Sequence, residues 1–272
     1  MTQDKLVNDG FELATYSSVA SLAVVLCGHA GNGKTHFGLT APGGIAYFNL
    51  DKGLKGVLQK FVNDKKIYLH NINMPKPETG VMFSEDKHGK AKAVTYQIVK
   101  EEFVDQARKC WDQVVHLSRT AYNSKNIKSI VYDTESAMWE LIRLARFGKT
   151  TQVEPYQYGP VNLEYSGLVE ELCGSGKNVI FLDRMKKTYM HEKWTGKYER
   201  GGFGSLGYLA DVSGQIVYNE KEGMWYIDIN DKCRIDPAFM GVRLPNDDYP
   251  LPVDFPNLAV SLVEGTEYED WE

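Results

Sequence analysis

The chain has 272 residues, of which 43% are hydrophobic and 25% charged, and its formal net charge is −5. This composition is typical of a globular protein large enough for one substantial α/β core. No apolar stretch approaches the roughly 20 residues of a membrane span, and the first residues lack the layout of a signal peptide, so we expect a cytoplasmic protein without membrane contact.

The first predicted element is an apolar strand over residues 22–27, which is followed by the segment GHAGNGKT at residues 28–35. This segment matches the Walker A phosphate-binding loop, in which glycines let successive backbone N–H groups point at a phosphate. Lys34 would reach the β- and γ-phosphates, and the Thr35 hydroxyl would bind Mg²⁺. We therefore predict ATP and Mg²⁺ as ligands. The expected nucleotide-binding residues are Gly28, His29, Ala30, Gly31, Asn32, Gly33, Lys34, Thr35 and His36.

The next segments predict a strand over residues 45–50 that ends at Asp51, a short helix over 54–61 and a strand over 67–70. Residues 74–93 combine prolines, glycines and lysines with few apolar residues, which indicates a surface insertion. From residue 95 to 118, apolar residues recur every three or four positions, and this spacing predicts an amphipathic helix that covers the sheet.

A further apolar strand over residues 129–133 ends at Asp133, about a hundred residues after the loop. An aspartate at this point can act as the Walker B residue, which orients a Mg²⁺-bound water behind Thr35. The alternative is an ordinary aspartate that caps the following helix. Hydrolysis also requires a group that orients the attacking water, and Asp51 and Glu135 are both candidates. Either carboxylate could instead cap a helix or lie at the surface.

The sequence then predicts helices over residues 136–147 and 163–172 and a strand over 178–183. The loop expected at residues 184–204 interleaves cations with aromatic residues, which is the composition of a surface that binds single-stranded nucleic acid. A solvated hairpin whose aromatic rings pack on the sheet is the alternative. The candidate DNA-binding residues are Arg184, Lys186, Lys187, Lys193, Trp194, Lys197, Tyr198 and Arg200.

The last part of the chain predicts a β-hairpin from the strands 215–219 and 224–229, followed by an acidic segment. Residues 244–272 hold eight acidic side chains and no lysine or arginine. This segment could dock on a basic protein partner or compete with nucleic acid for a basic groove, and a solvated end is the alternative. We expect a core over residues 1–243 and a separate acidic segment over 244–272.

Strands that alternate with helices predict a mostly parallel, doubly wound α/β sheet, with the C-terminal β-hairpin added to it. Ligands bind such sheets at the carboxyl ends of the strands, where the Walker A loop and Asp133 are both expected. The predicted fold is therefore that of a P-loop NTPase.

In the order of these motifs, residues 20–240 resemble the RecA-like ATPases, and in particular the small RecA-core proteins of bacteriophages that bind ATP and act in single-strand annealing or recombination. The resemblance implies that Asp51 stands where the family has a catalytic glutamate. It also implies that residues 184–204 bind DNA and that Asp183 or Arg184 takes the place of the γ-phosphate sensor. Lys232 and Arg234 resemble the K-x-R pair that reaches the nucleotide of a neighbouring subunit, which implies a homo-oligomer, either a filament or a ring.

The preferred function is an ATPase that assembles on single-stranded DNA and is stimulated by it. Two alternatives remain open. A nucleotide kinase would share the Walker A loop but should also have an arginine-rich lid, and no arginine cluster stands apart from residues 184–204. A non-catalytic, nucleotide-gated loader or binding module is compatible with aspartate in place of glutamate at position 51.

Overall fold

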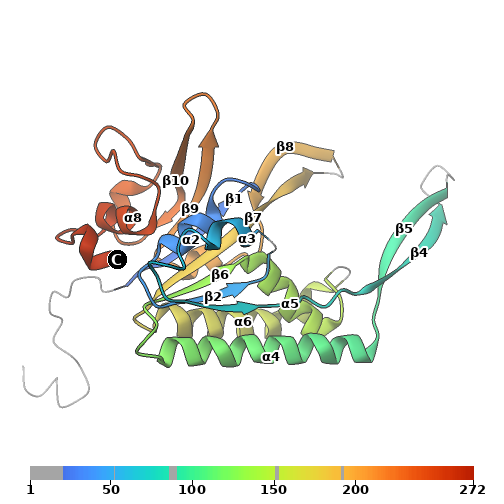
Figure 1. Cartoon of the computed structure of the whole chain (residues 1–272). Helices are drawn as coiled ribbons and strands as arrows, with labels where there is room; N and C mark the ends of the chain where they lie inside the picture. Colours follow the sequence, from blue (N-terminus) through green and yellow to red (C-terminus); the bar gives the residue numbers. More distant parts are fainter. Residues whose placement is uncertain (1–20, 52, 86–90, 151–152, 191–192) are drawn as a thin grey trace, which may run out of the picture.

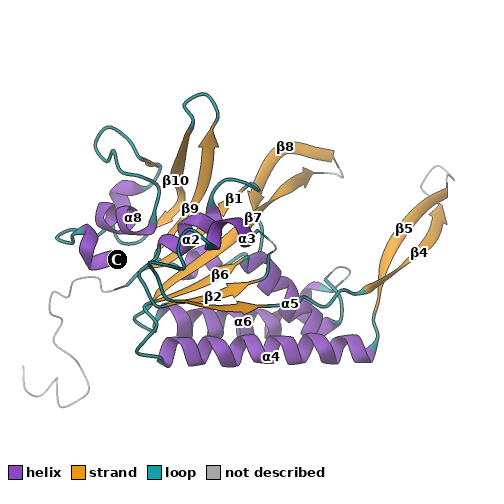
Figure 2. Ribbon diagram, in the orientation of Figure 1, coloured by secondary structure: helices purple, strands orange, loops and turns teal. Residues whose placement is uncertain are grey.

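The computed structural model describes residues 21–51, 53–85, 91–150, 153–190 and 193–272. Its centre is a mostly parallel sheet with helices on both faces, as predicted (Figures 1 and 2). The main sheet runs in the order β11 (Arg243–Leu244), β10 (Met224–Cys233), β9 (Val212–Asn219), β1 (Ala23–Gly28), β7 (Asn178–Met190), β6 (Ser129–Asp133), β2 (Ile45–Asn49) and β3 (Ile67–Asn71). The six strands from β9 to β3 are parallel, and β10 and β11 add antiparallel strands at one edge.

The central strands are apolar on both faces because helices cover both sides of the sheet. Alternate residues of β1 belong to different clusters: Ala23 and Val25 pack on one face, and Val24 and Leu26 on the other. The first face is covered by α4 (Glu101–Asn123), α5 (Glu135–Phe147) and α6 (Tyr158–Cys173). Opposite them lie α2 (Lys34–Thr40), α3 (Lys55–Leu58) and α8 (Phe255–Leu262). The remaining short elements are α7 (Leu206–Leu209) and the 3-10 turns Pro155–Gln157, Pro237–Phe239 and Tyr268–Trp271.

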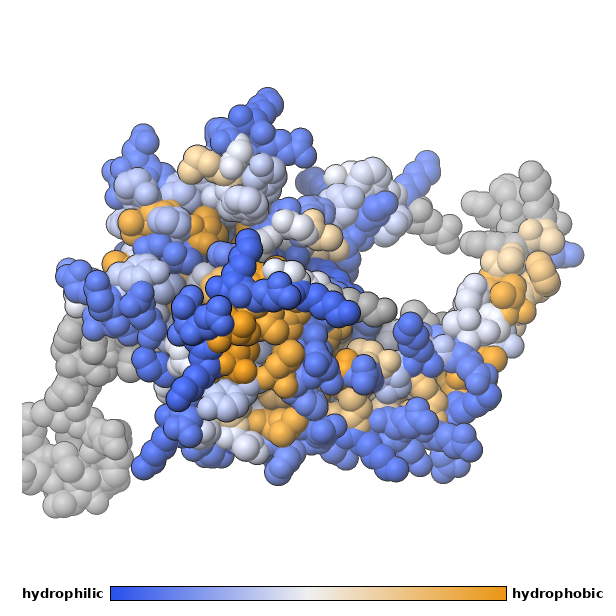
Figure 3. Space-filling model, viewed as in Figure 1, coloured by the Kyte–Doolittle hydropathy of each residue, from blue (hydrophilic) through white to orange (hydrophobic). Residues whose placement is uncertain are grey.

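The predicted surface insertion is an ordered hairpin in its described part, made of β4 (Glu78–Glu85) and β5 (Ala91–Ile98). Because residues 91–98 pair with β4, the helix expected from residue 95 begins only at Glu101. The hairpin projects from the body and carries exposed apolar side chains (Figures 1 and 3), among them Val81, Met82 and Phe83. Residues 95–98 were assigned to the helix because apolar residues recur at helical spacing from there on, but in the structure they belong to the strand β5.

The segment expected to be a loop at residues 184–204 is also largely a hairpin. β7 continues past the sheet to Met190, and β8 (Lys193–Arg200) returns antiparallel to it. We call residues 184–200, in their described part, the arm. Figure 1 shows the arm leaving the sheet at the end of β7.

The acidic C-terminal segment packs on the body. Phe255 and Trp271 are buried in the same apolar cluster as Phe37 of α2, and Lys128 Nζ donates to the backbone oxygen of Glu272 at 2.9 Å. The acidic side chains between residues 264 and 272 remain exposed. Among the described helices, none is long and apolar enough to cross a bilayer.

Candidate functional site

The loop at residues 28–35 has a backbone conformation that requires glycine. Gly31 and Gly33 have φ angles of +85° and +84°, in the left-handed region that other residues adopt only with strain. A Cβ on Gly28 would lie 2.9 Å from the carbonyl oxygen of Ile216. The glycines of the motif are therefore needed for both its curvature and its contact with β9.

Lys34 turns back onto the loop that precedes it. Its ammonium nitrogen donates to the carbonyl oxygens of Gly28 and His29, at 2.8 and 2.9 Å. Partial burial lowers the pKa of Lys34, while the negative charges of Asp133 and Asp51 raise it. The Lys34 ammonium thus lies where it can contact a phosphate bound by the loop. The carboxylates of Asp133 and Asp51 are close enough to favour its charged form.

Thr35 and Asp133, the two predicted magnesium ligands, meet at the carboxyl end of the sheet. The Thr35 hydroxyl donates to Asp133 Oδ2 at 2.7 Å, and the hydroxyl of Tyr47 donates to the same oxygen at 2.7 Å. Burial raises the pKa of Asp133, and these two hydrogen bonds oppose that rise. Tyr47 was missed in the sequence because it stands within an apolar strand, where tyrosine is an ordinary core residue.

The donor set fits Mg²⁺. This ion prefers oxygen ligands, keeps several waters, and is usually held by one or two protein side chains together with substrate phosphates. The Thr35 hydroxyl and the Asp133 carboxylate are oxygen donors 2.7 Å apart, directly beside the phosphate-binding loop. They would hold Mg²⁺ against the phosphates.

Asp51 lies on the same side of the sheet as Asp133. The backbone N–H groups of Leu50 and Asp51 both donate to the Asp133 carbonyl oxygen, at 2.6 and 3.1 Å. The Asp51 carboxylate forms an ion pair with Arg184 at 3.3 Å, and Arg184 stands opposite Gly28 in the β1–β7 register. The guanidinium of Arg184 also lowers the pKa of Lys34. Arg184 therefore lies beside the nucleotide loop, where the resemblance implies a γ-phosphate sensor, although it was also among the candidate DNA-binding residues.

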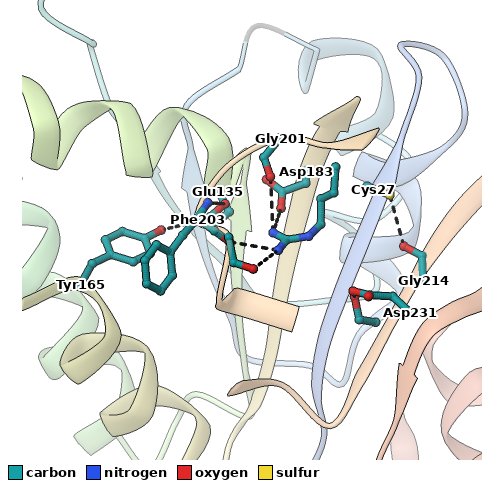
Figure 4. Close-up of polar contacts among 11 residues, drawn as sticks. Cys27, Glu135, Tyr165, Asp183, Gly201, Phe203, Gly214 and Asp231 are labelled. Carbon is teal, nitrogen blue, oxygen red and sulfur yellow. Dashed lines mark hydrogen bonds and ion pairs between the residues drawn. The ribbon is translucent and has the colours of Figure 1, made fainter. Parts of the chain in front are cut away.

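Glu135, the other candidate for orienting water, has a different environment. Its carboxyl group is fully buried at the start of α5, where it accepts hydrogen bonds from the Tyr165 hydroxyl at 2.5 Å and from the Phe203 N–H at 3.3 Å. Figure 4 shows Tyr165 and Phe203 on one side of Glu135 and Asp183 on the other. Tertiary structure thus places Glu135 in the core.

Asp183 is equally buried and forms an ion pair with Arg200 at 2.8 Å. Its second oxygen, Oδ1, lies close to Glu135 Oε2 beside Gly202, where a Cβ would lie within 2.9 Å of either oxygen. A proton on Glu135 satisfies both groups, because the carboxyl then donates to Asp183. Burial and the charge of Asp183 raise the pKa of Glu135 well above its usual range, consistent with a neutral acid.

The arm presents part of the predicted cation–aromatic set to solvent. Trp194 is 51% exposed and Tyr198 41%, and the Lys187 ammonium lies 5.1 Å from the centre of the Trp194 ring. Lys193 and Lys197 are exposed, and Lys186 pairs with Glu199 within the arm at 3.3 Å.

Arg200, which the sequence placed in the DNA-binding set, points inward instead. Besides Asp183, it donates to the carbonyl oxygens of Phe203 and Gly204, at 2.9 and 3.2 Å. Its side chain is only 15% exposed. Arg200 therefore anchors the foot of the arm and lies apart from the exposed cations that were predicted with it.

Lys232 and Arg234 lie away from the loop of their own chain. Both donate to the backbone oxygen of Tyr208, at the end of α7, and Arg234 also lies 3.7 Å from Asp211. In the sheet, Lys232 pairs with Ser213, which is near the beginning of β9, whereas the nucleotide loop follows the opposite end of β1. Both residues therefore lie at the end of the sheet opposite the nucleotide loop of their own chain.

A groove of about 980 Å³ begins at the loop and was not expected from the sequence. Its lining includes Asn32, Gly33 and His36 of the loop and α2, together with Trp225 and residues of the segment 245–253. A Cβ on Gly33 would lie 3.4 Å from the indole nitrogen of Trp225. The groove is the size and character of a small-molecule site and continues from the phosphate loop, so it can receive the nucleoside half of a nucleotide.

We expect Tyr47→Phe to move the acid limb of Mg²⁺-dependent nucleotide binding to higher pH. Losing the hydrogen bond from Tyr47 removes a contribution that lowers the pKa of Asp133, so this carboxylate would protonate, and stop binding metal, at a less acidic pH. Titrations of an ATP analogue across pH would measure the shift. Tyr132→Phe is the matched control, because the Tyr132 hydroxyl bonds Ser118 on the other face of the sheet. Coincident profiles for wild type and Tyr47→Phe would contradict the expectation.

Comparison with known proteins adds one finding. The family model described as an AAA domain matches residues 20–237, which include the loop, Asp51, Asp133 and the arm. No curated protein matches the chain.

Proposed function

Because this chain belongs to the AAA-domain family of P-loop ATPases, we propose that it binds and hydrolyses ATP and couples this reaction to the binding of single-stranded DNA. The observation that carries the proposal is the position of the arm. β7 runs from the sheet beside the nucleotide loop directly into a hairpin with exposed cations and aromatic rings.

In the ATP reaction, Lys34 and the loop bind the phosphates, and Thr35 and Asp133 hold the metal. Mg²⁺ supplies neutralising charge for the phosphate oxygens when it is bound. Asp51 is the residue of this chain that we assign to the attacking water, because its charge acts on Lys34 whereas Glu135 is bonded inside the core. As a carboxylate, Asp51 accepts a hydrogen bond from that water and orients it.

Arg184 is one partner of Asp51 that an incoming nucleotide can displace. The ion pair is half exposed, and such pairs contribute little stability, so an incoming phosphate can compete for the guanidinium. Displacement of Arg184 from Asp51 would then coincide with the arrival of a triphosphate. The same ion pair also favours the second candidate function, a nucleotide-gated loader without turnover, if Arg184 stays on Asp51.

One set of assays distinguishes the proposed functions. ATP turnover is measured with and without single-stranded DNA, alongside phosphoryl transfer to nucleosides. Turnover that rises with DNA supports the proposal, and ATP binding without turnover supports the loader. Phosphoryl transfer to a nucleoside would show a kinase. Single-stranded RNA serves as a second polynucleotide in the same assay.

We expect Trp194→Ala to weaken binding of a single-stranded oligonucleotide by about 1 to 3 kcal/mol, the usual contribution of one base–aromatic stack. Trp194 is half exposed on the arm and lies beside Lys187, so its ring can stack on a base while the cation contacts the backbone. Tyr198→Ala should act in the same direction. Tyr156→Ala is the control, since this exposed tyrosine lies outside the arm. Equal affinity of Trp194→Ala and wild type, measured by fluorescence anisotropy, would place DNA elsewhere.

We further propose that the protein acts as a homo-oligomer in which Arg234 contacts the nucleotide of a neighbouring subunit. Arg234→Ala should then lower DNA-stimulated turnover at least tenfold, because a cation supplied in trans stabilises transition-state charge. Arg243→Ala is the matched control, as Arg243 pairs with Asp228 on the same edge of the sheet. If DNA stimulated the ATP turnover of Arg234→Ala as strongly as that of wild type, Arg234 would not contact the nucleotide of a neighbouring subunit.

The biological output that we propose is annealing or recombination of the phage type, which rests on the resemblance in motif order. The exposed carboxylates between residues 264 and 272 make a basic protein a further proposed partner. A pull-down would compare the wild-type protein with a variant in which the acidic residues of the segment 264–272 are neutralised. Loss of a basic partner from the variant alone would support this proposal separately from DNA binding.

A further inference from the structure

The arm touches the nucleotide loop through two aromatic rings. The ring centres of His29, the second residue of the loop, and Tyr198 of β8 are 4.6 Å apart and nearly perpendicular, at 86°. This edge-to-face geometry is the favourable one for an aromatic pair. Sequence reasoning placed His29 with the nucleotide and Tyr198 with DNA, so the contact joins two predicted sites.

From Tyr198 the contact continues along the arm. The Trp194 ring is 6.0 Å from that of Tyr198, again edge to face, and Lys187 lies over Trp194. Lys187 is also the cross-strand partner of Tyr198. Two ring contacts therefore connect His29 to the cation and aromatic face that we propose for DNA.

Above its foot, the arm gains little support from the rest of the fold. Beyond Arg184, β7 and β8 pair with each other, the register between them shifts near Lys187 and Tyr189, and most of their residues are exposed. Two-stranded hairpins are only marginally stable alone. The foot itself is fixed, because Arg200 is bonded to buried Asp183. A contact halfway along such a hairpin can determine how ordered its outer part is.

We propose that His29 is a positioning residue that orders the arm when a nucleotide occupies the loop. The loop backbone on which His29 stands becomes fixed by phosphate, the His29 ring then holds Tyr198, and the outer arm pays less entropy on binding a polynucleotide. DNA therefore binds the nucleotide-loaded protein more tightly. This inference rests on the proposed function, since it deepens how the same two sites communicate.

The first test is amide hydrogen exchange of the full chain, with and without a non-hydrolysable ATP analogue and without DNA. In wild type, we expect slower exchange over both the loop, residues 28–35, and β8 when the analogue is bound. In Tyr198→Ala, which removes the other ring of the contact, the loop should still be protected while β8 no longer responds, and Tyr198→Phe, which keeps a ring, should restore the response. A protected loop with unchanged β8 in wild type would overturn the inference alone. An unprotected loop would instead contradict the proposed nucleotide site.

The second test measures the coupling directly, as the ratio of oligonucleotide Kd values without and with saturating analogue. We expect a ratio of about three to ten in wild type, the range that one aromatic pair can supply. His29→Ala should bring the ratio to about one, and His29→Phe should recover most of it. A ratio in His29→Ala equal to that of wild type would overturn the positioning role. Because the readout is a ratio, a general loss of affinity for either ligand does not mimic the effect.

Discussion

Lys34→Ala is expected to reduce ATP turnover by about 10²- to 10³-fold, the usual loss when one preorganised charge contact to a transition state is removed. The ammonium group donates to two carbonyl oxygens of the loop, and the charges of Asp133 and Asp51 act on its pKa, so its removal takes a positive charge directly out of the phosphate-binding loop. Turnover is measured at saturating ATP and with DNA present. Folding should be retained because the side chain is only half buried.

The matched control is Lys177→Ala. Lys177 precedes β7 at the opposite end of the sheet, where its ammonium donates to the Ser124 carbonyl oxygen. Its removal eliminates one positive charge from the chain but none from the site, so turnover should stay near the wild-type rate. If Lys34→Ala and Lys177→Ala had similar activity, the loop would not be the site of phosphate transfer.

Glu135→Ala is expected to cost about 3 to 5 kcal/mol in the free energy of unfolding, measured by urea denaturation. The substitution leaves Asp183 and the Tyr165 hydroxyl buried without their shared partner, and breaking a buried charged network carries a penalty of this size. Glu135→Gln should cost far less, since a neutral amide can still donate to Asp183 and accept from Tyr165. If Glu135→Ala and Glu135→Gln lost similar amounts of unfolding free energy, Glu135 would not be a protonated, neutral acid in the folded protein.

Turnover of Glu135→Gln also decides between the two candidate carboxylates. The structure predicts that this variant keeps most of its activity, because Glu135 is bonded in the core, and that Asp51→Asn loses activity. A hundredfold loss in a stably folded Glu135→Gln protein would reassign the orientation of water to Glu135.

The pH dependence of the unfolding free energy should differ between wild type and Glu135→Gln. The raised pKa of Glu135 means that the folded state holds a proton that the unfolded state releases. Its contribution is fully present below the ordinary glutamate pKa and is lost as pH rises through the raised folded value. Glu135→Gln lacks this titration, so its unfolding free energy should decline less than that of wild type on the alkaline side. Parallel profiles would argue against a proton shared with Asp183.

Much of the fold could be predicted because apolar spacing reports local structure. The strands ending at Gly28 and Asp133 and the helix over residues 136–147 are confirmed within one or two residues. The start of α4 was wrong, since residues 95–98 carry β-branched and aromatic side chains that pair with β4, and helical spacing within one segment does not show a strand partner. For the same reason, residues 74–93 were predicted only as a surface insertion, and residues 184–204 as a loop with a hairpin as the alternative.

By itself the sequence determined the chemistry of the phosphate loop, because its glycines, Lys34 and Thr35 are consecutive and covalent spacing fixes their relation. It also determined the alternation of strands and helices. Only tertiary structure decided that Asp51 pairs with Arg184, that Glu135 and Arg200 turn into the core, and that His29 meets Tyr198. These contacts join residues far apart in the chain, and they depend on the order of strands in the sheet and on the face to which each side chain points, which local patterns do not specify.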